Sequence, residues 1–553
     1  MVLDRALVVG ILLFQNVTTV DYMGPATYLE QLGSAVGQKL EFHTVSETAG
    51  GPIQPIHWGP ILASNSFEDA PRKWDIFIIP GGTGTVQISK DPKYVEYARA
   101  AAENSTDVLT VCTGARILAN SGILDGKKAT TNKLKFNEIA AESPEVDWQA
   151  QARWVVDGKY WSSSGIMAGI DLGHAYVSEK YGVDVAKKIA SEIEYVPNTD
   201  PANDPFTYIT KETPSPSPVP SAPASSRPAQ LPFRIGVVLY ENTTAMDMSA
   251  ALTFLEPLKT LAGKKTEMYT IAEKAGGPIQ PANQVPLFAS VSIDDAPRKW
   301  DILVIPGGPG DEAFIKNIKM LEYVRKAATK AKDVLTVSTG SRILAATGLL
   351  DGKYATAKKT EILKIQAAYP AVKWIVNRRW VDDTKYWTAS GSTAGLDMGF
   401  AYVTRRYNLK AAEKIATNTE YVPITNPVRD PFGLPTPAPS VVPAPKPPPK
   451  PREPPSSSAV PPPNPPPVPQ QTPSSSTVPP PKPPPKPRET PAPPLATPAP
   501  STTQTPGAGP APAAKGDYVY AGPARPDSDS LNTWCSVNCP QFCPTQFCKK
   551  KGE

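Results

Sequence analysis

Short apolar runs alternate with amphipathic stretches over about the first 200 residues of the chain. The pattern predicts strands over 6–14, 40–45, 75–79 and 108–111, and helices over 24–32, 92–104 and 114–121. Continuous apolar strands separated by helices are typical of a parallel sheet that is covered on both faces. In such a sheet, ligands bind outside the carboxyl ends of the strands. We therefore look for chemistry in the loops after residues 14, 79 and 111.

The whole pattern occurs twice. The segment GGPIQP at 50–55 returns at 276–281, and DAPRKWDI at 69–76 returns at 295–302, both at an offset of 226 residues. No insertion or deletion interrupts this correspondence over about 200 residues. Because loops usually tolerate changes in length, the gapless repeat predicts two copies of one fold, over 1–210 and 233–433.

Proline marks the segments outside the two copies. The 553 residues include 67 prolines, more than twice the usual share of about 5%. They are concentrated in a Pro/Ser-rich linker at 211–232 and in a tail at 434–530. Such segments bury too little apolar surface to fold, so we expect the tail to be disordered and extended. We interpret the tail as a spacer, with recognition by a proline-reading domain as the alternative.

Charge and hydropathy limit the partners. The chain has 57 basic and 52 acidic residues, a balance that does not favour nucleic acid. No apolar run reaches the roughly 18 residues of a membrane span. The stretch 6–14 could pass for the core of a signal peptide, but its equivalent at 233–240 lies in the middle of the chain, so both are expected to be buried first strands. We expect a cytoplasmic protein with no membrane partner, although the C-terminal cysteines leave an extracellular location open.

Three loops at the carboxyl ends of the predicted strands carry the most reactive residues. The sequence VLTVCTGARIL at 108–118 predicts a strand, a tight turn and a helix, with Cys112 at the turn. A thiol at the positive end of a helix is expected to have a lowered pKa and to act as a nucleophile. The loop PGGTG at 80–84 offers backbone N–H groups to a developing oxyanion. Asp21 follows the first strand and could transfer protons.

Each of these features also has a simpler explanation. Cys112 could be a small buried apolar residue, Asp21 a helix N-cap, and the Pro-Gly-Gly loop a plain turn. Their common position at one edge of the sheet favours a functional site.

On these residues the first copy resembles the ThiJ/PfpI superfamily, which has the class I glutamine amidotransferase-like fold, and within it the isocyanide hydratases. The shared motifs are VDYMGP at 20–25, IPGGTG at 79–84, VCTG at 111–114, GILDGKKATT at 122–131, GIMAGID at 165–171 and EY at 194–195. The resemblance implies flavodoxin-like, three-layer α/β/α domains, here two in tandem, followed by a disordered Pro-rich tail.

The resemblance also implies roles for individual residues. In isocyanide hydratases the elbow cysteine attacks the isocyanide carbon, an aspartate transfers protons, and water releases an N-substituted formamide. The catalytic residues would be Cys112 as nucleophile, Asp21 as general acid and base, and Thr113. The groups that position the substrate or stabilise the intermediate would be Gly81, Gly82 and Gly114. No cofactor and no metal are implied.

One departure separates this chain from other branches of the superfamily. Many relatives have histidine where this chain has Asn132. The three histidines, His43, His57 and His174, lie at none of the positions expected for a Cys-His-Glu triad. A peptidase or amidotransferase is therefore disfavoured.

The second copy has lost the cysteine. It keeps Asp247 and Thr339, but Ser338 replaces the elbow cysteine and Lys358 stands at the position of Asn132. A helix end can lower a thiol pKa, but it cannot ionise a far less acidic hydroxyl. We predict a degenerate, structural copy that packs on the first. Superfamily members are commonly homodimers, so the resemblance implies an intramolecular pseudodimer or a homodimer.

Four cysteines lie near the C-terminus in a segment at 531–553. Their spacing lacks the C-x-x-C pairs of a zinc ribbon and favours two disulfides, with three possible pairings, among Cys535, Cys539, Cys543 and Cys548. The segment resembles the Cys-rich caps of some fungal secreted chitin-active enzymes, which implies polysaccharide contact through Trp534, Phe542 and Phe547.

We keep three hypotheses for the function. The first is a Cys-dependent, cofactor-free hydro-lyase that acts on isocyanides or similar small electrophiles. The second is glyoxalase- or deglycase-like handling of reactive aldehydes by the same residues. The third is a non-catalytic protein that senses oxidation at Cys112 or binds a carbohydrate or another partner.

Overall fold

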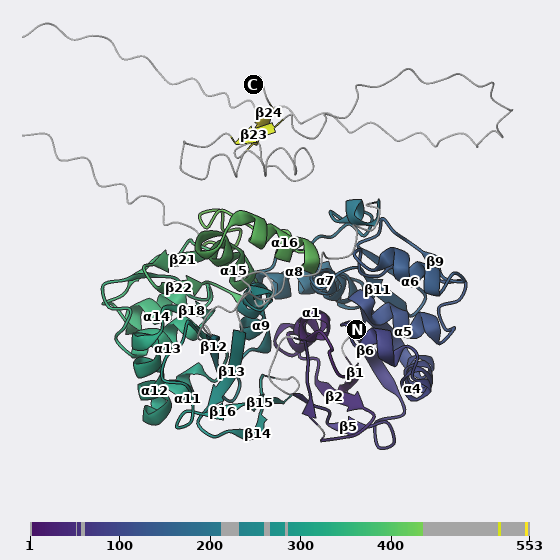
Figure 1. Ribbon diagram of the computed structural model, residues 1–553, viewed down its shortest axis with the longest axis horizontal. Helices are drawn as coiled ribbons and strands as arrows, with labels where there is room; N and C mark the ends of the chain where they lie inside the picture. The colour runs from purple at the N-terminus through teal and green to yellow at the C-terminus, as the bar shows by residue number, and fades with distance from the viewer. Residues whose placement is uncertain are drawn as a thin grey trace, which may run out of the picture. The chain divides into compact units, whose positions relative to one another are not determined.

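Each copy is built around a seven-stranded, mostly parallel sheet (Figure 1). The computed structural model describes residues 3–50, 52–56, 61–211, 232–258, 266–282 and 286–434, and the backbone of 518–520 and 548–550. The first sheet has the strand order β10 (Trp154–Asp157), β11 (Tyr160–Ser163), β7 (Ser105–Val111), β6 (Trp74–Ile79), β1 (Leu7–Leu12), β2 (Leu40–Ser46) and β5 (Asn65–Ser66). The second has the order β16 (Val291–Ser292), β13 (Thr266–Ala272), β12 (Phe233–Val238), β17 (Ile302–Ile305), β18 (Asp333–Val337), β22 (Tyr386–Ala389) and β21 (Trp380–Asp383).

Helices cover both faces of each sheet. Those of the first copy are α1 (Thr19–Glu30), α2 (Leu32–Val36), α3 (Thr85–Ile88), α4 (Pro92–Glu103), α5 (Ala115–Asn120), α6 (Phe136–Glu142), α7 (Ala168–Tyr181) and α8 (Val183–Glu192), with 3-10 turns at Cys112–Gly114 and Thr207–Lys211. Those of the second copy are α9 (Ala245–Leu255), α11 (Asp311–Lys316), α12 (Ile318–Lys330), α13 (Gly340–Ala346), α14 (Ile362–Ala368), α15 (Ser392–Arg406) and α16 (Leu409–Thr419).

The strand pairing confirms the predicted architecture. Strands β10 and β21 run antiparallel to their neighbours, and the other pairs within the two large sheets are parallel. Helices α1 and α7 pack together on one face of the first sheet, and α4 and α5 lie on the other. The chain therefore contains two tandem three-layer α/β/α domains.

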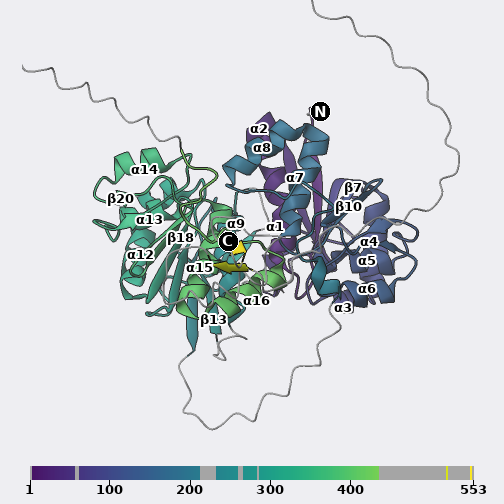
Figure 2. The same ribbon diagram turned by 90° about the horizontal axis from the view of Figure 1, so that it is seen from above.

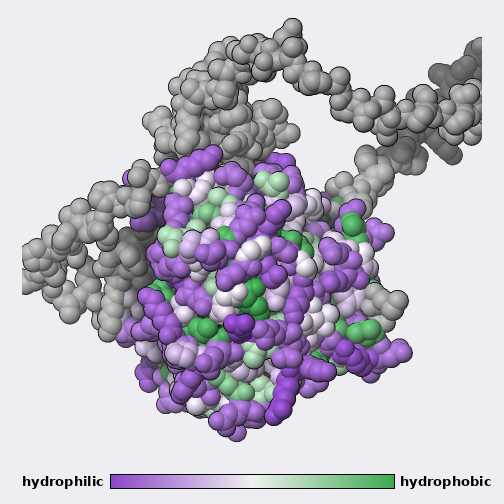
Figure 3. Space-filling model, turned by 90° about the vertical axis from the view of Figure 1, so that its right-hand side faces the viewer, coloured by the Kyte–Doolittle hydropathy of each residue, from purple (hydrophilic) through white to green (hydrophobic). Residues whose placement is uncertain are grey.

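Figure 3 shows a face on which polar side chains predominate, with apolar ones scattered in small groups.

Short strands add smaller sheets. One has the order β14 (Gly276–Ile279), β15 (Leu287–Ala289), β4 (Ile61–Leu62) and β3 (Pro52–Ile53). Two more pair β8 (Lys128–Ala129) with β9 (Asp147–Trp148), and β19 (Tyr354–Ala355) with β20 (Lys373–Trp374).

One helix begins earlier than its sequence predicts. Gly24 and Pro25 read as a helix start, but α1 begins at Thr19 and contains Pro25 in its interior. Every residue from Thr19 to Leu29 is buried, so packing of α1 against α7 outweighs the backbone hydrogen bond that the proline cannot donate. As a result, Asp21 lies in the first turn of a helix and not in a loop, and the N-cap is Thr18.

The two copies contact each other about an approximate two-fold axis. The Ser249 hydroxyl lies 3.5 Å from the sulfur of Met23, and these residues stand 226 positions apart. Strands β4 and β15 pair antiparallel through Ile61 and Leu287, which are likewise equivalent positions. Equivalent residues meet on the axis of an isologous interface. Helices α1 and α9 lie side by side at this interface (Figures 1 and 2), and one hydrophobic cluster extends through both copies.

Several expectations lie outside the described residues. These are the linker at 212–231, most of the tail, His57 and three of the four C-terminal cysteines, Cys535, Cys539 and Cys543. Within the C-terminal unit, strands β23 (Tyr518–Tyr520) and β24 (Cys548–Lys550) pair antiparallel. A search of the described segments finds no helix both long and apolar enough to span a membrane.

Candidate functional site

The predicted nucleophile lies at a sharp turn between β7 and α5. Cys112 has a φ of 58°, and its equivalent Ser338 has a φ of 57°. This left-handed conformation costs a non-glycine residue about 1 kcal/mol or more. Two residues further on, the backbone of Gly114 passes very close to Ile79. A Cβ at Gly114 would lie 2.2 Å from the carbonyl oxygen of Ile79. Since both copies have the same strained turn, the strain is a property of the fold and does not require a cysteine at this position.

Asp21 and the glycine loop meet the elbow from α1 and from the end of β6. Oδ2 of Asp21 accepts a hydrogen bond from the N–H of Gly81 at 2.9 Å. The Thr113 hydroxyl accepts one from the N–H of Gly82 at 3.0 Å. The structure therefore brings the predicted residues of the first copy together at the carboxyl end of the sheet. Both loop amides already have protein acceptors, so donation to an intermediate would require them to change partners.

Burial controls the protonation of Cys112 and Asp21. Cys112 is 7% exposed and Asp21 is fully buried. Burial raises the pKa of the Asp21 carboxyl well above its usual value, and hydrogen bonds from Gly81 and Cys112 oppose this only in part. Burial and the charge of Asp21 also raise the pKa of the Cys112 thiol. Our expectation of a lowered thiol pKa is wrong, because burial and the nearby carboxylates outweigh the N–H of Thr113, which favours the thiolate. Burial therefore favours the neutral forms of both side chains.

A carboxyl group from the second copy enters the site of the first. Glu420 follows α16, is fully buried and has a φ of 51°. Its Oε1 accepts hydrogen bonds from the N–H of Lys133 at 2.7 Å and the side-chain amide of Asn132 at 3.1 Å. Its Oε2 accepts one from the Ser164 hydroxyl at 2.7 Å. Gly165 makes room for this carboxyl group, since a Cβ there would lie 2.3 Å from Cδ of Glu420.

The exchange is reciprocal. Glu194 of the first copy enters the second, where its Oε1 accepts from the N–H of Lys359 at 3.0 Å and its Oε2 accepts from the Ser390 hydroxyl. A Cβ at Gly391 would lie 2.6 Å from Cδ of Glu194. Each copy therefore contributes one buried glutamate side chain to the other copy.

Buried charges surround Glu420. Nη1 of Arg153 lies 3.7 Å from its Oε2, and Nε of Arg153 donates to Oδ2 of Asp171 at 2.9 Å. Nζ of Lys133 lies 3.3 Å from Oδ2 of Asp204. These two cations therefore face three carboxyl groups in the buried cluster. Burial and the charge of Asp204 accordingly raise the pKa of Glu420.

The equivalent site of the second copy differs in its polar groups. Ser338 occupies the elbow, and the Thr339 hydroxyl accepts a hydrogen bond from the second glycine loop at 3.0 Å. The Ser392 hydroxyl donates to Oδ1 of Asp247. Burial raises the pKa of Asp247 to about 6, against the opposing effects of Ser392, nearby Lys358 and Ser338. Asp247 is therefore held by hydroxyl groups and has no thiol beside it.

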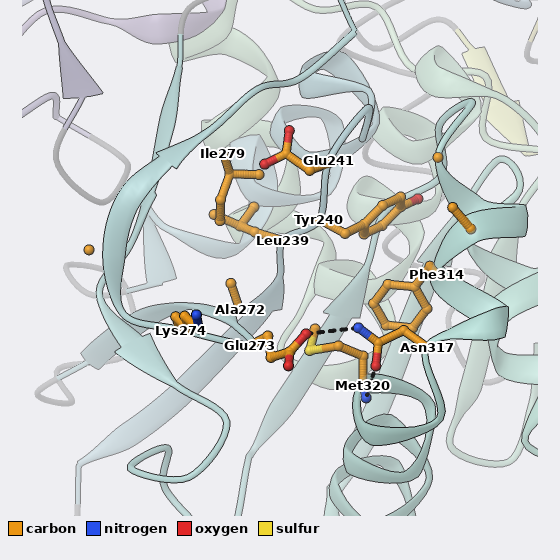
Figure 4. A pocket seen from close by; sticks show the side chains of 13 residues that line it. Leu239, Tyr240, Glu241, Ala272, Glu273, Lys274, Ile279, Phe314, Asn317 and Met320 are labelled. Carbon is orange, nitrogen blue, oxygen red and sulfur yellow. Dashed lines mark hydrogen bonds between the residues drawn. The ribbon is translucent and has the colours of Figure 1, made fainter.

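A pocket of about 510 Å³ lies in the second copy, at the carboxyl ends of β12 and β13 (Figure 4). It is lined by Leu239, Tyr240, Glu241, Ala272, Glu273, Lys274, Gly276, Ile279, Gly310, Ala313, Phe314, Asn317 and Met320. Ser338 is not among these residues. At the positions equivalent to Ala272 and Met320, the first copy has Ser46 and Tyr94, whose hydroxyl groups lie 3.2 Å apart. Two residues that line this pocket, Ala272 and Met320, therefore stand where the first copy has a hydrogen-bonded serine and tyrosine.

Sequence reasoning found the elbow but missed the crossing carboxylates. The pair EY at 194–195 returns at 420–421. This repetition indicates that the glutamate has a role in both copies. The linear sequence does not show which copy the side chain enters. Within the described parts of the chain, no cluster of three or more His, Cys, Asp or Glu side chains is placed to hold a metal ion.

The chain is similar to a known protein family and to several of its members. The model of the DJ-1/PfpI family matches residues 8–179 and 235–405. Isonitrile hydratase of Pseudomonas putida is 30% identical over 192 residues, which cover 35% of this chain and 80% of that enzyme. DJ-1 protein homolog E of Arabidopsis thaliana is 26% identical over 350 residues, or 60% of this chain and 77% of the homolog.

A solved structure is also similar to part of the chain. The crystal structure of a ThiJ/PfpI family protein from Pseudomonas syringae is 26% identical, with a TM-score of 0.33, and the match covers 37% of this chain and 84% of that one. The two segments matched by the family model each contain one elbow, with Cys112 in the first and Ser338 in the second.

Proposed function

Because this chain belongs to the DJ-1/PfpI family, we propose that its first copy is a cysteine-dependent, cofactor-free hydro-lyase that converts an isocyanide and water to an N-substituted formamide. The observation that carries the proposal is the buried pair of Cys112 and Asp21, placed at a strained elbow. The similarity to a bacterial isonitrile hydratase supports this choice of substrate class.

The pair supplies both a nucleophile and a proton. In the first step the sulfur of Cys112 bonds to the terminal carbon of R–N≡C, and the proton held by the pair moves to that carbon, which gives the thioimidate Cys–S–CH=N–R. Asp21, now a carboxylate, takes a proton from water as the water oxygen adds to the same carbon and passes this proton to the nitrogen, which gives Cys–S–CH(OH)–NH–R. The hydroxyl proton then moves through Asp21 to the sulfur as the carbon–sulfur bond breaks, which releases R–NH–CHO and returns the thiol.

The raised pKa of Asp21 suits this role. A carboxyl group whose pKa is raised by burial holds its proton more tightly, so it can act as a donor, and it becomes a base once the proton has left. The N–H of Thr113 already reaches the sulfur and favours its charged form. It would stabilise negative charge that develops at the sulfur when the carbon–sulfur bond breaks.

The second copy shares the strained turn but lacks the thiol. Ser338 has a hydroxyl that is far less acidic than a thiol, and Asp247 is engaged by the Ser392 hydroxyl. We assign the chemistry to the first copy and treat the elbow of the second as degenerate.

Kinetics with a simple alkyl isocyanide test this assignment. We expect Cys112→Ala to abolish formamide production, and Asp21→Asn to lower kcat/KM by about 10²- to 10⁴-fold because it removes the proton carrier. Ser338→Ala and Asp247→Asn are the matched controls in the second copy, and both should retain wild-type turnover. Formamide is followed by chromatography or mass spectrometry.

Turnover by Cys112→Ala at the wild-type rate would overturn the proposal. Methylglyoxal serves as a parallel substrate. If the wild-type protein consumes methylglyoxal but leaves the isocyanide intact, and if this loss also depends on Cys112, the same residues act on aldehydes and our substrate assignment is wrong.

A further inference from the structure

The Glu420 carboxyl reaches the elbow through a short chain of hydrogen bonds. It fixes the turn at 130–133 by accepting from Asn132 and Lys133. In the same turn, the Thr131 hydroxyl donates to the carbonyl oxygen of Cys112 at 2.8 Å. A residue of the second copy is therefore two hydrogen-bonded contacts from the backbone of the nucleophile.

The second copy lacks the last link of this chain. Glu194 accepts from the N–H of Lys359, but the residue equivalent to Thr131 is Ala357, which has no hydroxyl. The carbonyl oxygen of Ser338 instead accepts from the Ser341 hydroxyl of its own helix at 3.1 Å. The crossing carboxylate is thus retained in both directions, but only the one that enters the first copy is connected to the elbow.

Electrostatics give Glu420 a second route to the thiol. A negative charge on Glu420 raises the pKa values of Cys112 and Asp21. The cations Arg153 and Lys133 favour that charge, whereas burial and Asp204 oppose it. The titratable and charged groups that face Glu420 in this buried corner are Arg153, Lys133, Asp204, Asp21 and Cys112.

We propose that Glu420 of the second copy is a positioning residue for Cys112, so that the site of the first copy is complete only when the second copy is present. This inference rests on the proposed function, since it concerns the same nucleophile. It gives the second copy a role that needs no chemistry at Ser338.

The test compares Glu420→Gln with Glu194→Gln in the full chain. Both variants replace a buried, crossing carboxylate by an amide of the same shape, but only Glu420 is linked to Cys112 by the hydrogen bonds through residues 131–133. The rate of Cys112 alkylation by iodoacetamide, measured against pH with intact-mass readout, reports on the thiol whether or not an isocyanide is turned over. We expect Glu420→Gln to move the midpoint of this profile to lower pH by about 0.5 to 1, which is about a three- to tenfold change in rate below the midpoint.

Glu194→Gln should leave the alkylation profile and the formamide kinetics as in the wild type. Identical profiles for all three proteins, or equal displacement by both variants, would overturn the inference. The hydratase assignment fails separately, if Cys112→Ala remains active.

Thr131→Ala tests the hydrogen-bonded route on its own. The second copy already has alanine at the equivalent position, so the fold accommodates the change and the experiment stays informative if Glu420→Gln does not fold. We expect kcat to fall at least about fivefold, with KM changed less, because the elbow backbone loses its anchor. A wild-type kcat would exclude the Thr131 link and restrict any effect of Glu420 to its charge.

Discussion

At the level of single residues, the two elbows have nearly the same φ but carry different polar groups at equivalent positions. The second copy has Ser338 at the position equivalent to Cys112, a difference that the sequence alone reveals. It has Ser392 at the position equivalent to Ile166, and the Ser392 hydroxyl binds the carboxyl group of Asp247. This consequence could not be predicted, because the two residues are 145 positions apart. The sequence also could not predict that the pKa of the Cys112 thiol is raised, since the shift depends on how deeply the thiol is buried.

At this scale Asp247 makes the stability of the protein depend on pH. Its pKa is about 6 in the folded protein, against an ordinary value of 3.8. The folded state therefore binds the proton more tightly, and the free energy of unfolding falls as pH rises from about 4 to 6. The loss is at most about 3 kcal/mol, since one pKa unit corresponds to about 1.4 kcal/mol.

We expect Asp247→Asn to flatten this slope, as measured by urea denaturation at a series of pH values. The exposed residue Asp351 provides a control, and Asp351→Asn should preserve the wild-type slope. An unchanged slope in Asp247→Asn would show that Asp247 does not titrate in this range.

The secondary structure elements were predicted best where local signals and packing agree. Helix α4 starts at Pro92, as predicted, and the Asp91 side chain caps it. Helix α1 was misplaced because burial against α7 keeps Pro25 inside a helix. The junctions β11–α7 and β22–α15 were not singled out at all. They hold Gly165 and Gly391, against which the crossing carboxylates pack.

These junctions predict a specific sensitivity to a methyl group. Gly165→Ala should displace the side chain of Glu420 and lower the free energy of unfolding by about 3 kcal/mol, the usual cost of breaking a buried charge cluster. Formamide production should fall with it. Gly391→Ala should cost similar stability but preserve turnover per folded molecule.

The control for the methyl group itself is Gly33→Ala in α2, where the nearest atom to the added Cβ lies 3.6 Å away. This variant should unfold like the wild type in urea. Equal activity in Gly165→Ala and Gly33→Ala would contradict the importance of the junction.

For the whole molecule, the gapless repeat was enough to predict two copies of one α/β/α fold. The resemblance to the superfamily implies an intramolecular pseudodimer or a homodimer, but the particular contacts between the copies, such as Met23 with Ser249, carry no sequence signature. The inner hydrophobic cluster runs through both copies, and each copy contributes a buried carboxylate to the other. The copies are therefore expected to unfold together.

Leu396→Ala tests this cooperativity. Leu396 is fully buried in α15 of the second copy, and its truncation should cost about 2 to 5 kcal/mol. We expect Cys112 in the first copy to become labelled by iodoacetamide at a correspondingly lower temperature. Labelling at the wild-type temperature would mean that the two copies unfold independently.

The crossing carboxylates also bear on what tandem fusion achieves. In a homodimer, a residue supplied by the neighbouring chain is lost whenever the protein is diluted below its dissociation constant. Here Glu420 is on the same chain as Cys112, so its local concentration at the elbow does not depend on how much protein is present. The fused pair is therefore expected to keep the same specific activity from micromolar to subnanomolar protein, at concentrations where a dimer that shares its sites would dissociate.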